Sequence, residues 1–317
     1  MKQPLIILTG PTAVGKTKAS IGLAKAINGE IISADSMQVY KYMDIGSAKI
    51  RPEEMQGVKH YLIDELEPDE EFNVVRFQQM AKQAMQEIYA HGKVPILVGG
   101  TGFYIQAVLY DIDFHENEED NTYRMELEQL AKDKGASYLH HMLAEVDEVS
   151  AKVIHENNVK KVIRALEYYQ QTGQKISEHN AQERLKESPY NAVYFVLNDD
   201  RKNLYDRINF RVDQMIEEGL VEEVRRLKEC GYKKDMVSMQ GLGYKEILDY
   251  LDGIYSLDEA IEIIKRDTRH FAKRQLTWFR RERNVEWIDK REFHYNEERI
   301  LAELLRILKI NGIEGEI

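Results

Sequence analysis

The chain of 317 residues is long enough for one large domain or two smaller ones, and its composition, 43% apolar and 31% charged, is ordinary for a globular protein. Its net charge of −11 argues against an indiscriminate nucleic-acid binder, and its single cysteine excludes an internal disulfide and a multi-cysteine zinc site. No run approaches the roughly 18–20 apolar residues of a membrane span, and no signal peptide is apparent before the apolar run Leu5–Leu8. We therefore expect a cytoplasmic protein that does not enter membranes and, since nothing in the sequence requires an oligomer, a monomer.

The apolar run at Leu5–Leu8 leads directly into a match to the phosphate-loop pattern G-x-x-x-x-G-K-[ST], and a helical pattern follows. Strand, loop and helix are the order that this motif needs. Glycines let several backbone N–H groups turn toward phosphate oxygens. Lys16 is placed to neutralise the terminal phosphate, and the Thr17 hydroxyl is placed to bind Mg²⁺. The residues that we expect to bind a di- or triphosphate are Gly10, Pro11, Thr12, Ala13, Val14, Gly15, Lys16 and Thr17.

The first hundred residues alternate between strand-like and helical patterns. Strands are predicted at Ile31–Ala34, Tyr61–Asp64 and Val94–Val98, with a long amphipathic helix at Phe72–His91. This rhythm predicts an α/β fold, a P-loop NTPase-like parallel sheet flanked by helices. In such sheets ligands lie beyond the carboxyl ends of the strands. Asp35 and Thr101 occupy two such positions and are therefore candidate site residues.

The pattern changes after about Tyr110. Residues 111–190 contain no convincing strand and are predicted to form an all-helical insertion. Strands resume at Val193–Leu197 and Val285–Ile288, separated by helices and followed by a terminal helix at Glu297–Leu308. We therefore expect a catalytic core made of residues 1–110 and 191–317, interrupted by the insertion.

Each candidate side chain has more than one interpretation from its residue type alone. Asp35 is suited to bind Mg²⁺ through water, to act as a general base or to cap a helix. The nearby Gln38 amide is able to pair with adenine. Thr101 is either an N-cap or a hydroxyl facing the same crevice. Arg207 and Arg211 share a helix face, as a solvated pair or as a phosphate ligand.

The segment from Lys265 to Arg283 is locally basic although the protein is acidic. Its cations are Lys265, Arg266, Arg269, Lys273, Arg274, Arg280, Arg281 and Arg283, against Asp267 and Glu282. Aromatic residues such as Phe271 and Trp278 are interleaved with them. Arginines bind phosphates and aromatic rings stack on unpaired bases, so the segment is either an RNA-binding strip or a helix with a solvated charged face.

As a set, these segments resemble the bacterial tRNA dimethylallyltransferases, also called tRNA isopentenyltransferases, over nearly the whole chain. A phosphate loop alone is shared by many families, but the further segments in this order are not. They are Asp35-Ser-Met-Gln-Val-Tyr40, Gly57-Val-Lys-His-Tyr-Leu-Ile-Asp64, Gly99-Gly-Thr-Gly-Phe-Tyr104, Lys160-Lys-Val-Ile-Arg-Ala-Leu-Glu167, Gly241-Leu-Gly-Tyr-Lys-Glu246 and Arg274-Gln-Leu-Thr-Trp-Phe-Arg280.

The resemblance implies that the dimethylallyl group of dimethylallyl diphosphate moves to N6 of the adenosine just 3′ of a tRNA anticodon. The phosphate loop, Lys16, an arginine such as Arg211 and Mg²⁺ would stabilise the departing diphosphate. Asp35 would be the general base and Thr101 a contact to the target nucleotide. The adenine would leave the anticodon-loop stack to react.

The resemblance also implies a set of tRNA contacts and gives the insertion a role in gripping the anticodon stem-loop. The residues implied are Asp35, Ser36, Met37, Gln38, Thr101, Arg124, Lys160, Lys161, Arg164, Gly243, Lys245, Lys273, Arg274, Gln275, Trp278 and Arg280.

Three alternative functions are compatible with parts of the sequence. A small-molecule or nucleotide kinase would use the same loop with ATP. An adenylate isopentenyltransferase would modify free AMP, ADP or ATP. A non-catalytic RNA-binding protein would use only the basic segment. That segment disfavours the first alternative, the large insertion disfavours the second, and the intact phosphate loop disfavours the third.

Overall fold

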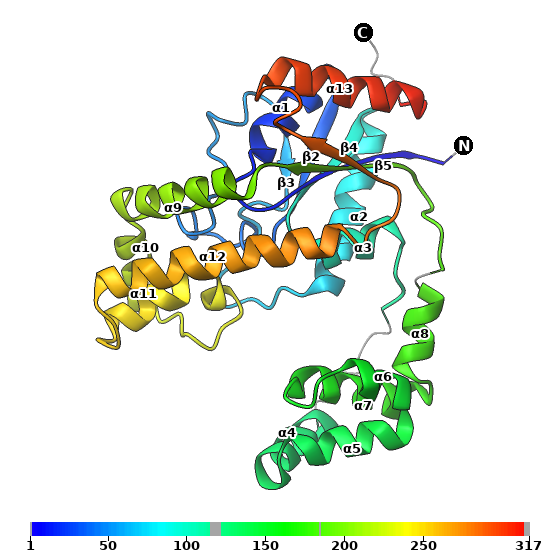
Figure 1. Cartoon of the computed structure of the whole chain (residues 1–317), viewed down its shortest axis with the longest axis vertical. Coiled ribbons are helices and arrows are strands. Elements are labelled where there is room, and N and C mark those ends of the chain that lie inside the picture. The colour runs from blue at the N-terminus through cyan, green and yellow to red at the C-terminus, as the bar shows by residue number, and fades with distance from the viewer. Residues whose placement is uncertain (1, 115–121, 184, 314–317) are drawn as a thin grey trace. The chain divides into compact units, whose positions relative to one another are not determined.

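A computed structural model describes residues 2–114, 122–183 and 185–313 of the chain. Within these residues, six parallel strands form one sheet in the order β3-β2-β4-β1-β5-β6 (Figure 1). The strands are β1 (Pro4–Thr9), β2 (Gly29–Ala34), β3 (His60–Tyr61), β4 (Val94–Gly99), β5 (Asn191–Asn198) and β6 (Val285–Asp289). The α/β prediction is confirmed.

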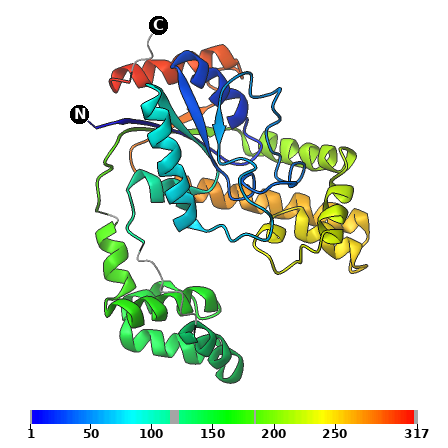
Figure 2. The same ribbon diagram turned by 180° about the vertical axis from the view of Figure 1, so that it is seen from behind.

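Helices cover both faces of the sheet. In the unit that contains the sheet they are α1 (Lys16–Ala26), α2 (Val74–Ala90), α3 (Gly102–Leu109), α9 (Arg201–Glu217), α10 (Leu220–Glu229), the 3₁₀ turn η1 (Ser238–Gln240), α11 (Tyr244–Leu251), α12 (Leu257–Phe279) and α13 (Glu297–Ile310). Helices α1 and α13 pack on one face, and α2 and α3 pack on the other (Figures 1 and 2).

Two apolar cores, one on each side of the sheet, hold these layers together. Successive strand residues point to opposite faces. Ile6 and Leu8 of β1 therefore enter the core shared with α1 and α13, whereas Leu5 and Ile7 enter the core shared with α2 and α3. All four side chains are fully buried. Strands that are apolar on both faces are what a sheet covered on both sides requires.

The strand register brings the chemically active segments to one edge of the sheet. Thr9 pairs with Gly99, and Ala34 pairs with the same glycine from the other side. On the other side of β1, the last residues of β5 and β6, Asn198 and Asp289, pair with each other. The segments that follow β1, β2, β4 and β6 consequently leave the sheet at its common carboxyl edge, where ligands bind in folds of this class.

The predicted strand at Tyr61–Asp64 is wrong beyond its first residue, because β3 ends at Tyr61. Leu62 and Asp64 have φ angles of 62° and 56°, which no strand accommodates. The turn has its own bonds: the Asp64 N–H donates to the Gln38 carbonyl at 3.2 Å, and the Asp64 carboxylate accepts from buried Lys49 at 2.5 Å. These long-range contacts outweigh the local β-propensity of the sequence.

Residues 112–187 form a compact unit separate from the one made by residues 1–111 and 188–317. Its described elements are all helices: α4 (Thr122–Lys134), α5 (Ala136–Val146), α6 (Glu148–Val153), α7 (Val159–Thr172) and α8 (Ile176–Glu183). The unit has an apolar core of its own around Leu139, Leu143 and Val162. Residues 115–121 and 184 of the predicted insertion lie outside the described residues.

None of the described helices combines the length and the apolar character that a membrane crossing requires.

Candidate active site

The phosphate loop joins β1 to the first turn of α1. Gly10, Ala13 and Gly15 all have positive φ angles, of 149°, 62° and 99°. Gly10 must be glycine for a second reason, because a Cβ there would lie 2.5 Å from the Leu197 carbonyl oxygen of β5. The loop is thus wrapped tightly against the carboxyl edge of the sheet, with the N-terminus of α1 immediately behind it.

Lys16 lies over this loop. Its ammonium group donates to the carbonyls of Gly10 and Pro11, both at 3.0 Å. Burial lowers the pKa of Lys16 to about 8; Asp35 acts in the opposite direction, and Arg211 lowers the pKa further. The structure therefore brings the predicted Lys16, Asp35 and Arg211 into one electrostatic neighbourhood. Thr17, the predicted metal ligand, is exposed at the start of α1.

Further cations surround the loop. Burial lowers the pKa of Arg211, and neighbouring Arg207 adds to the lowering. A Cβ on Gly15 would lie 3.5 Å from Arg207 Nη2 and 3.2 Å from Lys290 Nζ. Four cationic side chains thus converge on one small loop, an arrangement that suits an anion of high charge density.

Asp35 and Thr101 meet beside the loop. The Thr101 N–H donates to the Ala34 carbonyl at 3.3 Å, which fixes the turn after β4 to the end of β2. Asp35 Oδ1 accepts the Met37 N–H at 2.9 Å, so the carboxylate is oriented within its own turn. Thr101 precedes α3, but its hydroxyl makes no capping bond to that helix. Of the two interpretations of Thr101, the cap is therefore not the one its side chain adopts.

Gln38 is held by the protein itself. Its Oε1 accepts the Ser33 hydroxyl at 3.1 Å, and its Nε2 donates to the carbonyls of Ser47 and Ala48. The loop that provides these carbonyls is fastened by Glu223. That carboxylate accepts three N–H groups, those of residues 44, 45 and 46, together with the Tyr244 hydroxyl at 2.7 Å. The Gln38 amide, which we expected to contact RNA, is therefore hydrogen-bonded within the protein.

The segment at Gly241–Glu246 packs against the segment that follows Asp35. A Cβ on Gly241 would lie 2.5 Å from the Met37 methyl group, and Gly243 has a φ of 94° at the N-cap of α11. Ser36 and Met37 are half-buried, as is Lys245, which pairs with Glu246 at 3.4 Å. Ser36, Met37 and Lys245 are thus partly accessible on packed segments, whereas Gly243, also predicted to contact RNA, is buried.

Gln275 has a different place from the one we expected. Its side chain is buried, its Oε1 accepts the Thr12 N–H at 2.9 Å, and its Nε2 donates to the Gly100 carbonyl at 3.0 Å. One amide thereby ties α12 to the phosphate loop and to the turn that carries Thr101. The structure corrects the expected RNA contact to a positioning role.

The rest of the basic segment lies on α12 and at its C-terminal end. Lys273, Arg274 and Arg280 are exposed, and Trp278 is half-buried against Gly102. A groove of about 390 Å³ runs along this face, lined by His270, Lys273, Arg274, Thr277, Trp278 and Arg281. The opposite face of α12 is buried and apolar apart from Gln275. Both interpretations of this segment require a buried face and an exposed basic face, so the choice between RNA binding and a solvated charged face stays a prediction.

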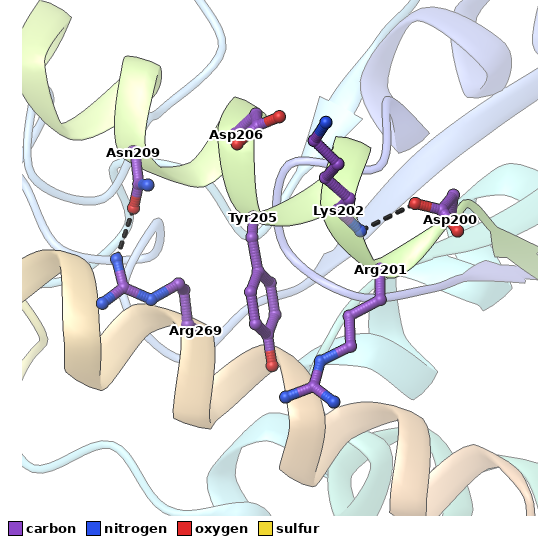
Figure 3. Close-up of a pocket in the computed structure, with 7 residues that line it drawn as sticks. All are labelled: Asp200, Arg201, Lys202, Tyr205, Asp206, Asn209 and Arg269. Carbon is purple, nitrogen blue, oxygen red and sulfur yellow. Dashed lines mark hydrogen bonds between the residues drawn. The ribbon is translucent and has the colours of Figure 1, made fainter.

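A larger hollow, about 610 Å³ in volume, lies between α9 and α12. Figure 3 shows Tyr205 and Arg201 of α9 pointing toward α12, whose Arg269 bonds Asn209. Asp200 and Asp206 also line it, so its cations are largely offset by carboxylates. The phosphate loop, on which four cations converge, is therefore better suited to an anion than this larger hollow.

The predicted contacts of the insertion divide into two kinds. Arg124 makes a bidentate pair with buried Glu167, at 2.8 and 2.7 Å, which joins α4 to α7. Arg124 thus joins two helices of the unit, and with 40% of its side chain exposed its predicted RNA contact stays a prediction. Lys160 and Lys161 are exposed at the start of α7, and Arg164 is half-buried one turn later.

Lys290 was missed from the sequence altogether, and Gln275 was assigned to RNA without its bridge to the phosphate loop. Lys290 and the bridging role of Gln275 both act on the phosphate loop. Lys290 carries a usable signal, because it stands just beyond the predicted strand at Val285–Ile288. The strand-end rule that selected Asp35 and Thr101 would have selected it too. Gln275 carries no such signal, since helix periodicity does not reveal which loop a helix touches.

Comparison with known proteins gives one consistent family. The family model described as IPP transferase matches residues 38–282. The chain is 63% identical to a tRNA dimethylallyltransferase of Lachnoclostridium phytofermentans over 306 residues, 96% of this chain and 97% of that one. A tRNA dimethylallyltransferase of Acetivibrio thermocellus is 54% identical, with 98% of both chains covered.

Solved structures with a similar fold belong to the same family. The full-length tRNA isopentenylpyrophosphate transferase of Bacillus halodurans has a TM-score of 0.74 at 47% identity, covering 98% of both chains. A eukaryotic dimethylallyltransferase acting on tRNA has a TM-score of 0.84 at 28% identity, covering 98% of this chain and 80% of that one. The chain belongs to the IPP transferase family, the tRNA dimethylallyltransferases.

Proposed function

We propose that this protein transfers the dimethylallyl group of dimethylallyl diphosphate to N6 of the adenosine 3′-adjacent to the anticodon of tRNA, releasing diphosphate. The observation that carries the proposal is the convergence of the phosphate loop, Asp35 and Thr101 at the carboxyl ends of neighbouring strands. An anion site and a potential base stand side by side there, as transfer from a diphosphate to an amine requires.

The chemistry follows from these groups. A bond forms between N6 and the allylic carbon while the bond from that carbon to the diphosphate oxygen breaks, and its electron pair leaves with the diphosphate. Loop N–H groups, Lys16 and Arg211 stabilise the charge that develops on the leaving group. Asp35 accepts the hydrogen bond of the amine and then its proton. Thr101 holds the target nucleotide through its hydroxyl.

The residues fit a magnesium ion that is shared with the substrate. Mg²⁺ in phosphate-loop proteins takes few protein ligands and keeps substrate oxygens and waters. Thr17 offers such a hydroxyl, and no group of three or more histidine, cysteine or carboxylate side chains among the described residues forms a metal cage. We propose that Thr17 holds the ion, which when bound would neutralise part of the diphosphate charge.

We further propose that tRNA lies on the basic face of α12 and on the surface formed by Ser36, Met37 and Lys245. Exposed Arg274 and Arg280 would contact phosphates, and Trp278 would offer a ring to an unstacked base. Lys160, Lys161 and Arg164 of the helical insertion would hold the anticodon stem-loop. An extruded base alone offers little surface, so a second holding surface compensates for the cost of unstacking. We also propose a cytoplasmic monomer, with monomer mass testable by light scattering.

The test offers labelled dimethylallyl diphosphate to three acceptors in parallel: an anticodon stem-loop, AMP, and buffer alone. We expect label in the stem-loop and diphosphate released in equal amount. Label in AMP would point to an adenylate isopentenyltransferase. Label in neither, with ATP consumed in a fourth reaction, would favour a kinase.

A further inference from the structure

Lys290 is a buried cation that the proposed chemistry does not use. It follows β6 directly, and its backbone N–H donates to the Asn198 carbonyl at 3.1 Å, which extends the β5–β6 pairing by one residue. Only 6% of the residue is exposed. Among the described residues it forms no ion pair with a carboxylate. Burying the charge of a lysine in this way costs folding free energy unless the charge is compensated by a partner.

The ammonium group of Lys290 is aimed at the phosphate loop. Its Nζ donates to the Val14 carbonyl at 3.3 Å. It also lies 3.2 Å from the position that a Cβ of Gly15 would occupy. Burial lowers the pKa of Lys290, and Arg207 lowers it further. Glu297 and Asp199 act in the opposite direction. The geometry nevertheless places the ammonium group directly behind the loop, on the side of the Val14 carbonyl.

The contact orients one particular peptide. In a trans peptide the C=O and the N–H point in opposite directions. A cation that holds the Val14 carbonyl on one side of the loop therefore turns the Gly15 N–H to the other side. A positive charge at the carbonyl oxygen also polarises the peptide, which makes its N–H a stronger donor. Loop N–H groups are the donors that cradle a phosphate.

We infer that Lys290 is a positioning residue for the leaving diphosphate, which fixes and polarises the Val14–Gly15 peptide so that the Gly15 N–H donates to a phosphate oxygen. The inference rests on the proposed binding of a diphosphate by the loop. Lys290 differs in this from Lys16, whose charge would meet the phosphate directly. It acts from behind the loop, through the backbone.

The experiment compares inorganic pyrophosphate binding by the full-length wild type, Lys290→Met and Lys18→Met. Methionine replaces the unbranched aliphatic part of the lysine side chain and removes the donor and the charge. Lys18 is a matched control, because it is a highly exposed lysine of α1 whose nearest carboxylate is 3.7 Å away. Its loss removes the same charge nearby without touching the loop carbonyl.

A spectroscopic readout isolates the peptide itself. The sequence contains two Val-Gly pairs, Val14–Gly15 and Val98–Gly99. Carbonyl-¹³C valine combined with ¹⁵N-glycine therefore selects two amide resonances, with Gly99 of β4 as the internal reference. A stronger hydrogen bond moves an amide proton downfield, so the Gly15 resonance reports directly on the proposed bond.

We expect pyrophosphate to shift the Gly15 amide downfield in the wild type and in Lys18→Met, and to leave Gly99 in place. In Lys290→Met the shift should be much smaller, and the Kd for pyrophosphate should rise about tenfold, the scale of one charge-assisted hydrogen bond. A Kd within twofold of wild type would overturn the inference. So would a wild-type Gly15 amide that binding does not move, a result that needs no variant. Failure of the wild type to bind pyrophosphate or dimethylallyl diphosphate would instead overturn the proposed function, and the inference with it.

Discussion

At the scale of single residues, the state of Lys16 decides how the loop responds to pH. Burial lowers its pKa to about 8 from an ordinary value of 10.5, so the ammonium form that an anion needs is lost near pH 8. The last ionisation of a phosphate lies near pH 6 and does not interfere. We expect the Kd for dimethylallyl diphosphate to rise above pH 8, approaching about tenfold per pH unit.

The measurement is a ligand titration at intervals between pH 7 and pH 9.5. Lys16→Arg is the control, because a guanidinium keeps its charge over this range. Its affinity should be lower but independent of pH. A wild-type Kd that stays constant up to pH 9.5 would contradict the assigned role of Lys16.

Asp35 allows a second test at this scale. Asp35→Asn keeps the oxygen that accepts the Met37 N–H and removes the base. We expect kcat to fall about 10²–10⁴-fold, the usual contribution of a general base, with the Kd for dimethylallyl diphosphate within about threefold of wild type. Diphosphate affinity that falls together with kcat would instead place Asp35 on a metal ion.

At the scale of elements, the two faces of α12 make different contacts. The buried face carries Gln275 to the phosphate loop, and the exposed face carries Arg274 on the helix. Arg280 follows at its C-cap. Replacing both arginines with Gln should raise the KM for tRNA and reduce the salt dependence of RNA binding, by about one unit of logarithmic slope for each phosphate that is no longer neutralised. Arg306→Gln, which replaces an exposed arginine on α13, is the control. An unchanged salt slope in the double variant would place the RNA elsewhere.

Glu282, just after α12, links this end of the helix to α3. Its carboxylate accepts from Gln106 at 2.8 Å, and burial raises its pKa from 4.5 to about 7. The folded state therefore binds more protons than the unfolded state between pH 4.5 and 7, and this contribution to stability is lost as the pH rises through that window.

Glu282→Gln removes this dependence while keeping an acceptor for Gln106. We expect the Tm of the variant to exceed that of wild type by several degrees at pH 8 and to approach it at pH 5. The corresponding change in the free energy of unfolding is about 2 kcal/mol at most. Glu286→Gln, an exposed carboxylate of β6, should show no such trend. A Tm difference that is the same at both pH values would contradict the shifted pKa.

The sequence predicts elements better than it predicts their contacts. Periodicity located the strands of the sheet, since apolar runs such as Val94–Val98 have few alternatives in a covered parallel sheet. It failed at Tyr61–Asp64, where Lys49 and Gln38 bind the chain from afar. The strand-end rule located Asp35 and Thr101. Which arginines the loop meets depends on how α9 packs, and no local pattern records that.

At the scale of the whole molecule, the helical insertion is a unit with its own core, whose ends enter and leave the other unit at Asp111 and Ser188. Replacing residues 112–187 with a short flexible linker should leave a folded core that binds dimethylallyl diphosphate, because both apolar cores beside the sheet lie outside that segment. The truncated protein should lose binding of an anticodon stem-loop. Parallel titrations with the two ligands, on protein shown to be folded, decide this. Tight stem-loop binding by the truncated protein would confine the RNA site to the α12 surface.

The central claim, N6 prenylation beside the anticodon, is tested most directly by mapping the product. Wild-type protein is incubated with dimethylallyl diphosphate, Mg²⁺ and unmodified tRNA, and the tRNA is then digested and sequenced by mass spectrometry. We expect N6-dimethylallyladenosine at the position 3′-adjacent to the anticodon, one diphosphate released for each modified tRNA, and almost no product with Asp35→Asn. Unmodified tRNA under conditions in which the protein binds both substrates, or a dimethylallyl group on another nucleotide, would contradict the proposed function.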